Sequence, residues 1–429
     1  MNESNYFAVT LPESSKVVTI VARKNTDFIE ILHHAVSRTE YFMGGKIENA
    51  LPDAVQAIRH TLPPCDSNLV VEATYLGISG ALSVQVNAEN TITIPPHREI
   101  TQKDKDLIDE SAVPALNNQL PIGYQLLDYV PLHYYVGPEE KLDPLGHRGD
   151  SLTVSAVGVA GHSRGINALV DCLSRAALET AETIPTATAA VHSTVAGRDE
   201  KHQAVALIDI GHSVTSVAVC VNGKIISSRS FLSGGANVTQ DIREILQAKD
   251  PESVKIKYGS CVPSFVEDAS EVAIKKTNGE THLEKRSHLS RIIQKRIEFD
   301  IIQPALKYID REIIPLTKLR GGIVLVGGTS GLDHIEDLTK LIAADLGCPH
   351  ILVQKPLKLS PDHIHNIPDE ISGPEFAAAL GLLSVAANWS AHEIPESLPE
   401  IRTIGSSFVR AVAGVFGAKI ITRYGGLAK

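Results

Sequence analysis

Short runs in which apolar and polar residues alternate are separated in this chain by longer amphipathic segments. Residues 6–9 and 17–22 predict the two strands of a hairpin around the polar turn PESS. A helical pattern follows over about 53–62, and the run LVVEATYLGIS is typical of a strand that ends at the glycines of 77–80. The chain therefore begins with an alternation of strand and helix signals.

The middle of the first half differs from its surroundings in residue composition and in the pattern of apolar positions. The segment VQVNAENTITI alternates and predicts a half-buried hairpin, with its turn at or near Asn87–Asn90. Residues 95–150 are rich in proline, glycine and charge and carry short strands such as YQLLDYVPLHYYV. They indicate a small α+β unit inserted into a larger domain. The strand SLTVSAVGVA and the helix INALVDCLSRAAL then restore the α/β pattern.

From Gln203 a second α/β segment repeats the order of the first. The runs AVALIDIG, SVTSVAVCV and KIISSRSFL predict three strands, and Asn222-Gly223 between the last two is a strong hairpin signal. Helices over about 238–247 and 289–309, the strand GGIVLVGG and a helix stopped by Gly347 follow. Two halves of this kind indicate an internal duplication and not a short-period repeat.

Composition narrows the class of protein. A chain of 429 residues predicts two to four domains or subdomains, and 43% hydrophobic and 21% charged residues are ordinary for a globular protein. The formal net charge of -10 excludes a general attraction of the body for nucleic acid or anionic lipid. Five widely spaced cysteines without a CxxC motif indicate reduced core residues in a cytoplasmic protein. The first residues do not resemble a signal peptide, and no run of about 20 apolar residues could span a bilayer, so we expect a soluble or peripheral protein.

The block DIGHSVT at 209–215 lies between two predicted strands and carries candidate chemistry. A turn at Gly211 lets backbone N–H groups approach a phosphate closely. The carboxylate of Asp209 can hold a hydrated magnesium ion, and the hydroxyls of Ser213 and Thr215 can donate to phosphate oxygens. Taken alone, the block fits an ordinary hairpin better than a phosphate site.

Two further glycine-rich turns follow in the second half. The block SGGAN at 233–237 precedes a helix, where paired glycines suit a phosphate or a nucleoside. The block VGGTSGL at 326–332 follows a buried strand, and its small residues would admit a flat adenine ring against the backbone. Taken alone, each of these turns is also consistent with an ordinary glycine-rich turn that binds no ligand.

The order of these blocks is more specific than any one of them. A DxG hairpin, a GG turn, a helix with Glu252 and Lys255, and a strand that ends in GGTSGL resemble the layout of actin-like ATPases. In detail the chain resembles the bacterial cell-division FtsA family from about Met43 to Leu383. The resemblance is carried by GISG at 77–80, EIT at 99–101, DPLGHRG at 143–149, LIDIGHSVTSVAV, NGK and SGG within 207–235, KIKYG at 255–259, GGIVLVGGTSGL at 321–332 and PEFAAALGLL at 374–383.

The resemblance implies an α/β, actin-like (ribonuclease H-like duplicated) two-domain fold with an FtsA-type inserted subdomain, to which EIT and DPLG belong. The implied division is 1–81 for the first part of domain 1, 82–161 for the inserted subdomain, 162–200 for the second part of domain 1, 201–233 for the domain 2 core, 234–318 for the domain 2 outer subdomain, 319–355 for the return of that core, 356–392 for the return of domain 1, 393–400 for a linker and 401–429 for an amphipathic membrane-targeting helix.

The resemblance also implies ATP and Mg²⁺ as cofactors, with Asp209 on the magnesium side. The implied nucleotide-binding residues are Ser14, Ser15, Lys16, Asp209, Gly211, His212, Ser213, Thr215, Gly234, Gly235, Glu252, Lys255, Gly327, Gly328, Thr329 and Ser330. The family's first phosphate turn has the form D-I-G-T-S-K, whereas Leu11 and Glu13 stand here at its Asp and Gly positions. We therefore expect weak or absent ATPase activity, and no catalytic base is identified.

The function implied by the resemblance is a filament-forming adaptor. It would anchor the FtsZ ring to the inner face of the cell membrane at the division site and recruit other division proteins, with no nucleic-acid partner. The FtsZ C-terminal tail would dock on the outer subdomain near 234–318. Basic residues there could suit an acidic tail: Lys275, Lys276, Lys285, Arg286, Arg291, Lys295 and Arg296.

The C-terminal segment has a charge and an apolar pattern of its own. After Glu400 no acidic residue occurs, whereas basic residues recur up to Lys429. On a helix the apolar residues fall on or near one face, which is typical of a helix lying in a membrane surface. The implied membrane contacts are Ile404, Phe408, Val412, Val415 and Phe416 with the cations Arg410, Lys419 and Arg423. The alternative is a terminal helix packed on the protein's own body.

Two other functions remain open from the sequence. One is a PilM-like pilus assembly platform, which shares the DIG, NG and GG blocks. The other is a serine hydrolase, because GHSRG at 161–165 matches G-x-S-x-G between a strand and a helix, with Ser163 as nucleophile. His334 and His363 are examples of later histidines for that alternative.

Overall fold

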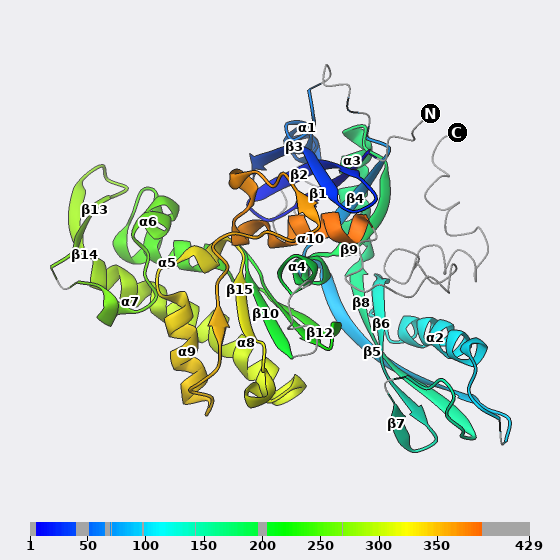
Figure 1. Ribbon diagram of the computed structural model, residues 1–429. Coiled ribbons are helices and arrows are strands. Elements are labelled where there is room, and N and C mark those ends of the chain that lie inside the picture. The colour runs from blue at the N-terminus through cyan, green and yellow to red at the C-terminus, as the bar shows by residue number, and fades with distance from the viewer. Residues whose placement is uncertain are drawn as a thin grey trace.

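The computed structural model describes residues 6–39, 51–64, 69, 71–96, 98–141, 143–195, 204–267 and 269–387. Figure 1 shows two sheets on either side of a pair of central helices, with a third sheet and a mainly helical unit at the two ends of the molecule. The central helices are α4 (Thr186–Thr194) and α10 (Ala377–Ala386). The expected linker and C-terminal helix lie outside the described residues.

The first sheet has the strand order β17-β3-β2-β1-β4-β9. Strands β1, β2 and β3 form antiparallel hairpins, whereas β1, β4 and β9 run parallel. One face packs on α4 and α10, and the other packs on α1 and α3. The bounds are Tyr6–Pro12 for β1, Lys16–Lys24 for β2, Ile29–Arg38 for β3, Ala73–Ile78 for β4, Thr180–Pro185 for β9, Ile364–His365 for β17, Leu51–Arg59 for α1 and Ser163–Arg175 for α3.

The second sheet repeats this arrangement in the order β12-β11-β10-β15-β16. Its two hairpins and two parallel pairs match β3-β2-β1-β4-β9 strand for strand, so the predicted duplication is confirmed. The predicted Asn222-Gly223 turn is present with both residues at positive φ. The bounds are Val205–Ile210 for β10, Thr215–Val221 for β11, Lys224–Phe231 for β12, Gly322–Val326 for β15 and Val353–Gln354 for β16.

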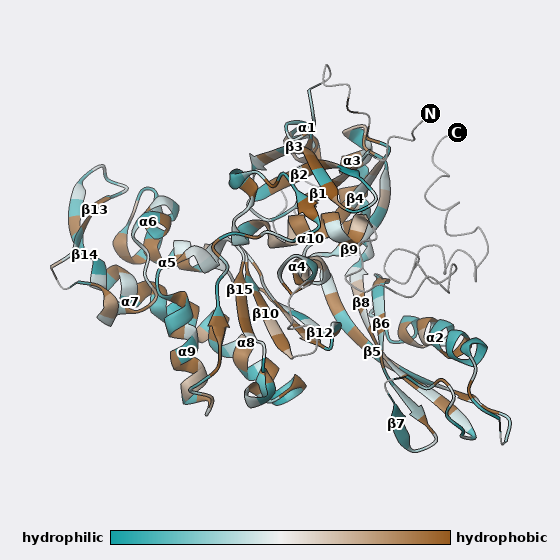
Figure 2. Ribbon diagram, in the orientation of Figure 1, coloured by the Kyte–Doolittle hydropathy of each residue, from teal (hydrophilic) through white to brown (hydrophobic). Residues whose placement is uncertain are grey.

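Helices α4 and α10 form a layer that both sheets share. Apolar residues of β1 and β2 and of β10, β11 and β15 belong to one buried cluster with these two helices. Figure 2 shows the hydrophobic colour concentrated on the inner strands β1, β10 and β15. Burial at about 25 cal/mol per Å² is the main stabilising term for such a layer. The opposite face of the second sheet packs on α5, α7, α8 and α9 (Ile335–Asp345), and the left-handed Gly347 lies just beyond α9.

A third, four-stranded antiparallel sheet has the order β5-β8-β6-β7 and carries α2 on one face. Its own core includes Ile108 and Leu116 from α2 and Tyr134, Leu152 and Val154 from the strands. The bounds are Ser83–Thr93 for β5, Gln102–Asn117 for α2, Tyr124–Val136 for β6, Glu139–Lys141 for β7 and Ser151–His162 for β8. We call this unit the insert.

The hairpin predicted within VQVNAENTITI is wrong. Residues 83–93 form the single strand β5, and all of them pair with β8 without a break in register. Asn87 and Glu89 are exposed at alternate positions, while Val86 and Ile92 lie toward α2. The alternation thus continues through the polar residues, and a segment without glycine has no reason to turn there.

The outer unit contains helices and one small hairpin. Its longest element runs from α7 through two π-helical turns and α8, which agrees with the helix predicted over about 289–309. The bounds are Gly235–Leu246 for α5, Pro251–Tyr258 for α6, Glu271–Lys275 for β13, Thr281–Lys285 for β14, Arg286–Arg296 for α7, Ile297–Ile302 and Ile309–Ile313 for the π-helical turns, and Gln303–Tyr308 for α8. Short 3₁₀ turns cover Gly80–Leu82, Pro263–Phe265, Leu316–Lys318, Gly328–Gly331, Asp369–Ile371 and Pro374–Phe376.

Asp128 lies on β6, where the insert meets α4. Its carboxylate accepts a hydrogen bond from the backbone N–H of Tyr129 and one from Thr188 Oγ1 at 3.5 Å. Burial raises the pKa of Asp128 to about 7, because the charged form loses its hydration. The carboxyl group is therefore largely protonated in the folded protein at mildly acidic pH.

We expect Asp128→Asn to stabilise the protein increasingly as pH rises from about 4 to 8. An unfolded carboxyl group titrates near pH 4, so unfolding between about pH 4 and 7 releases a proton, and the wild-type protein loses stability as pH rises through that window. The substitution should leave the free energy of unfolding nearly unchanged below about pH 4, and its stabilising effect should be about 1–3 kcal/mol larger at pH 8 than at pH 5. Urea denaturation at both pH values measures this, with Asp27→Asn at an exposed turn as control. An effect of equal size at both pH values would contradict the prediction.

Candidate functional site

Three turns that are distant in the sequence meet at the ends of β10, β12 and β15. Gly235 N donates to Gly211 O at 3.0 Å, and Ala236 N donates to His212 O at 2.6 Å. Thr329 Oγ1 also donates to Gly211 O, at 3.0 Å. The structure therefore brings together the three blocks that the sequence singled out.

Glycine is required at two positions of this junction because no side chain would fit. A Cβ on Gly234 would lie 2.6 Å from His212 O. A Cβ on Gly327 would lie 2.3 Å from Asp209 Oδ1, and Gly327 has a φ of +85°. Gly328 differs, because the nearest heavy atom to its Cβ position is 3.9 Å away. The backbone is thus closely packed below Gly327 and open beside Gly328.

Two hydroxyl groups at the junction have no hydrogen-bond partner in the part of the protein that the structure describes. They are Ser213 Oγ and Ser233 Oγ, and both atoms are buried. Other hydroxyls here are engaged, since Thr215 Oγ1 donates to Ser233 O at 2.8 Å and Ser330 Oγ donates to Gly327 O at 2.7 Å. A buried polar group without a partner is unfavourable, and an external oxygen-rich ligand would satisfy both serines.

Asp209 lies at the end of β10, against Gly327. Burial is the main cause that raises the pKa of Asp209 to about 7, Glu13 acts in the same direction, and Lys16 opposes them. No group of three or more His, Cys, Asp or Glu side chains that could hold a metal occurs in the part of the chain that the structure describes. Asp209 alone could not coordinate Mg²⁺. It could do so only as in nucleotide-binding sites, where water molecules and phosphate oxygens complete the coordination shell of the ion.

The first turn, between β1 and β2, lies close enough to Asp209 for Glu13 and Lys16 to affect the pKa of its carboxyl group. Lys16 Nζ lies 3.5 Å from the Glu13 carboxylate and donates to Glu375 O at 3.0 Å. The same ammonium lies 4.2 Å from the centre of the Phe376 ring. Ser14 and Ser15 form the half-buried tip of the turn.

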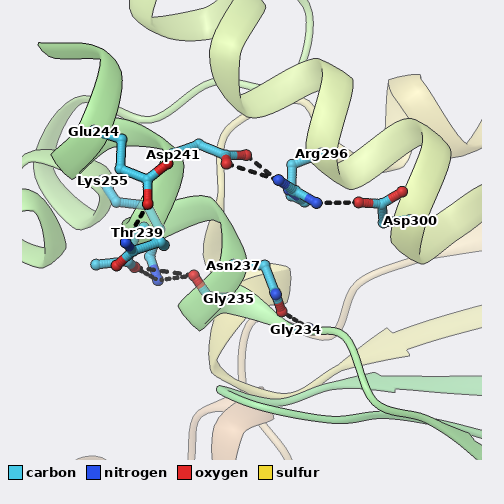
Figure 3. A network of polar contacts seen from close by, with 10 residues as sticks. Gly234, Gly235, Asn237, Thr239, Asp241, Glu244, Lys255, Arg296 and Asp300 are labelled. Atoms are coloured by element: carbon cyan, nitrogen blue, oxygen red, sulfur yellow. Dashed lines mark hydrogen bonds and ion pairs between the residues drawn. The ribbon is translucent and has the colours of Figure 1, made fainter.

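Lys255 connects α6 to the first turns of α5. Figure 3 shows its side chain beside Gly235 and Thr239. Its Nζ donates to Gly235 O at 3.0 Å, to Thr239 Oγ1 at 2.9 Å and to the Glu252 carboxylate at 2.9 Å. Burial lowers the pKa of Lys255, and Glu252 partly offsets this. The three N–H donors of this ammonium are thus all engaged within the protein, while Glu252 stays partly exposed beside the junction.

Sequence reasoning missed a neighbouring ion-pair network. Arg296, at the end of α7, donates from Nε and Nη2 to the Asp241 carboxylate of α5, each at 2.7 Å, and also bonds Asp300 (Figure 3). The spacing of Arg296 and Asp300 along a helix could have indicated one contact. Nothing in the sequence indicates the contact with Asp241. The sequence placed Arg296 among the residues that could bind an acidic tail. In the structure it pairs with Asp241 and Asp300 instead.

The histidines considered for a serine hydrolase have other partners. His162, beside Ser163, accepts a hydrogen bond from Gly165 N at 3.2 Å and caps α3. His334 Nδ1 lies 3.2 Å from Asp337, and His363 Nε2 lies 2.6 Å from Ser384 Oγ. The G-x-S-x-G segment therefore serves here as a helix start, and these contacts do not favour a hydrolase.

The residues predicted to contact a membrane lie outside the described part of the chain. These are Ile404, Phe408, Arg410, Val412, Val415, Phe416, Lys419 and Arg423. Among the helices that the structure does describe, none combines the length and the apolar character needed to traverse a bilayer.

Comparisons with known proteins agree with one another. A family model described as cell division protein FtsA matches residues 206–381. The cell division protein FtsA of Neisseria meningitidis is 27% identical over 393 residues, which cover 90% of this chain and 91% of that protein. The protein of the same name from Bacillus subtilis is 24% identical over 397 residues, covering 90% and 84%.

A solved structure is similar in fold. The PilM-PilN type IV pilus biogenesis complex matches with a TM-score of 0.59 and 16% identity, over 88% of this chain and 97% of that one. A sequence identity of 16% supports a shared fold but not a shared role in pilus assembly. The duplicated sheets and this match confirm the predicted actin-like fold. From the family model and from relatives matched along most of their length, the chain is similar to the cell division proteins FtsA, and its fold is actin-like.

Proposed function

We propose that this chain binds ATP with Mg²⁺ at the junction of the three turns. In this proposal it forms filaments that anchor the FtsZ ring to the membrane and recruit further division proteins. One observation carries the nucleotide assignment: two buried serine hydroxyls, which have no partner among the described residues, lie beside Gly234 and Gly327, where no side chain would fit. Such an arrangement offers O–H and N–H donors to phosphate oxygens at close range.

Each turn would hold a different part of the nucleotide. The Gly211–Ser213 turn and Gly234 would hold phosphates, and the open side of Gly328 would accept the adenine ring. The exposed part of Glu252 would reach the ribose hydroxyls. Mg²⁺ would supply positive charge to the phosphates from a position beside Asp209. Leu11 and Glu13 replace an Asp and a Gly of the family's first turn, so we propose weak or absent hydrolysis.

Nucleotide would act on assembly by selecting one arrangement of the two sheets. The phosphate turns belong to the second sheet, whereas Lys16 belongs to the first, and both sheets pack on α4 and α10. A ligand that contacts both sides favours the conformation in which they are closest, which is a population shift. Contacts between protomers in a filament would then form preferentially in that conformation.

The outer unit would receive the acidic FtsZ tail. Arg286 is engaged by Asp333 at 2.7 Å, and Arg296 by Asp241, so neither is available. Four other cations of the set are exposed on β13, β14 and α7: Lys275, Lys285, Arg291 and Lys295. Membrane attachment would come from residues 401–429.

Gly328→Arg should lower the affinity for Mg-ATP at least about tenfold, which corresponds to about 1.4 kcal/mol. The arginine side chain would fill the open space proposed for adenine, and the backbone at Gly328 is not left-handed, so the fold should tolerate it. Isothermal titration calorimetry measures the affinity. Ile122→Arg, at a fully exposed position of the insert, is the matched control. Equal affinity for wild type and Gly328→Arg would place the nucleotide elsewhere.

A further inference from the structure

The turn that holds Glu13 is linked to Asp209 by a continuous set of contacts. Lys16 Nζ donates to the backbone oxygen of Glu375, in the 3₁₀ turn Pro374–Phe376. The carbonyl of Pro374, in the same turn, accepts a hydrogen bond from Gly327 N at 3.0 Å. Gly327 in turn lies against the Asp209 carboxylate. These segments form the floor of the proposed nucleotide site.

The floor of the proposed site contains the carboxyl groups of Glu13 and Asp209 and the ammonium group of Lys16. Lys16 already forms an ion pair with Glu13. The side chains of Lys16 and Glu13 are 16% and 30% exposed, so water screens their charges only in part. Lys16 is held by Glu13, by the Glu375 carbonyl and by the Phe376 ring. Glu13 also acts electrostatically on Asp209, because it raises the pKa of that group. Glu13 thus already forms an ion pair with the lysine that would otherwise bind an incoming phosphate.

We infer that Glu13 determines the phosphate-chain specificity of this site and makes the chain favour a nucleoside diphosphate over a triphosphate. The inference rests on the proposed function. A triphosphate carries about one more negative charge than a diphosphate, and it must place that charge beside Glu13 and Asp209 without a free lysine. The carboxylate of Glu13 acts as an internal competitor for the cation that would stabilise the additional phosphate.

Two variants separate the charge of Glu13 from its size. Glu13→Gln keeps the shape and removes the charge, and Glu13→Gly removes both. Calorimetric titrations of full-length protein with ADP and with ATP, each with Mg²⁺, give the ratio of the two affinities. We expect both variants to raise the affinity for ATP about tenfold and the affinity for ADP about threefold or less. Glu271→Gln, which removes an exposed carboxylate on β13, should leave the ratio unchanged, and melting temperatures report the fold of each variant.

The outcomes distinguish this inference from the proposed function. If Gly328→Arg weakens both nucleotides but the Glu13 variants keep the wild-type ratio, the site stands and the specificity role is wrong. If Gly328→Arg changes neither affinity, the site is misplaced and the inference fails with it. If the wild type binds neither nucleotide, or binds ATP as tightly as ADP, the inferred preference for the diphosphate is wrong.

Discussion

Gly381→Ala should destabilise the protein more than any other single methyl addition considered. A Cβ at this position of α10 would lie 1.7 Å from Ala189 O and 2.4 Å from Ala189 C, both in the backbone of α4. Backbone atoms cannot rotate away, so the helices must move apart. Both helices are packed between two sheets, and their separation would open the core that the two sheets share. We expect a loss of about 4 kcal/mol or more in the free energy of unfolding.

Chemical denaturation and the yield of soluble protein measure this loss. Gly328→Ala is the matched control, since the same methyl group there meets nothing closer than 3.9 Å. That control should change the free energy of unfolding by less than about 0.5 kcal/mol. A Gly381→Ala protein with wild-type stability would show that α4 and α10 are not in backbone contact.

Removal of residues 401–429 should abolish binding to anionic vesicles. From Ile401 onward the chain has five cations, Arg402, Arg410, Lys419, Arg423 and Lys429, and no acidic residue. Each cation near an anionic surface contributes about 1 kcal/mol, while the rest of the chain is acidic and would be repelled. The apolar face of the predicted helix adds burial in the acyl boundary. We expect vesicle co-sedimentation to fall at least about tenfold.

Two full-length variants test the orientation of this helix. Phe408→Glu places a charge on the predicted apolar face and should reduce vesicle binding almost as much as truncation does. Ser406→Glu places the same charge away from that face and should have a much smaller effect. Vesicle binding by the truncated chain at the level of the full chain would refute membrane attachment through this segment, and the segment would then belong to the protein's own body or to a partner.

The duplicated sheets could be predicted because their signals are local. The Asn222-Gly223 turn and the alternation of apolar residues determine hairpins over a few residues. The order of the glycine turns then indicated a common site before the structure showed Gly211, Gly235 and Thr329 in contact. By contrast, β5 was misread because alternation alone does not distinguish one long strand from a hairpin, and the partner strand β8 is about 70 residues away.

The electrostatics of the site could not be predicted from the sequence. Lys255 looked like a ligand contact, but its three acceptors depend on how α5 packs on α6. The raised pKa of Asp209 depends on burial and on a turn nearly 200 residues earlier in the chain. Such effects arise from tertiary distances, which no spacing along the chain encodes. The substitution at Glu13 was visible, but its contact with Lys16 beside Asp209 was not.

The shared helical layer has a consequence for the ancestry of the two repeats. Both α4 and α10 lie outside the stretch from β10 to β16, so the second sheet has no cover of its own on that face. A freed second repeat would present Leu207, Ala218 and Val324 to water. The two repeats are therefore not interchangeable modules. They now form an obligate pair, in which one copy completes its fold on a surface that the rest of the chain provides.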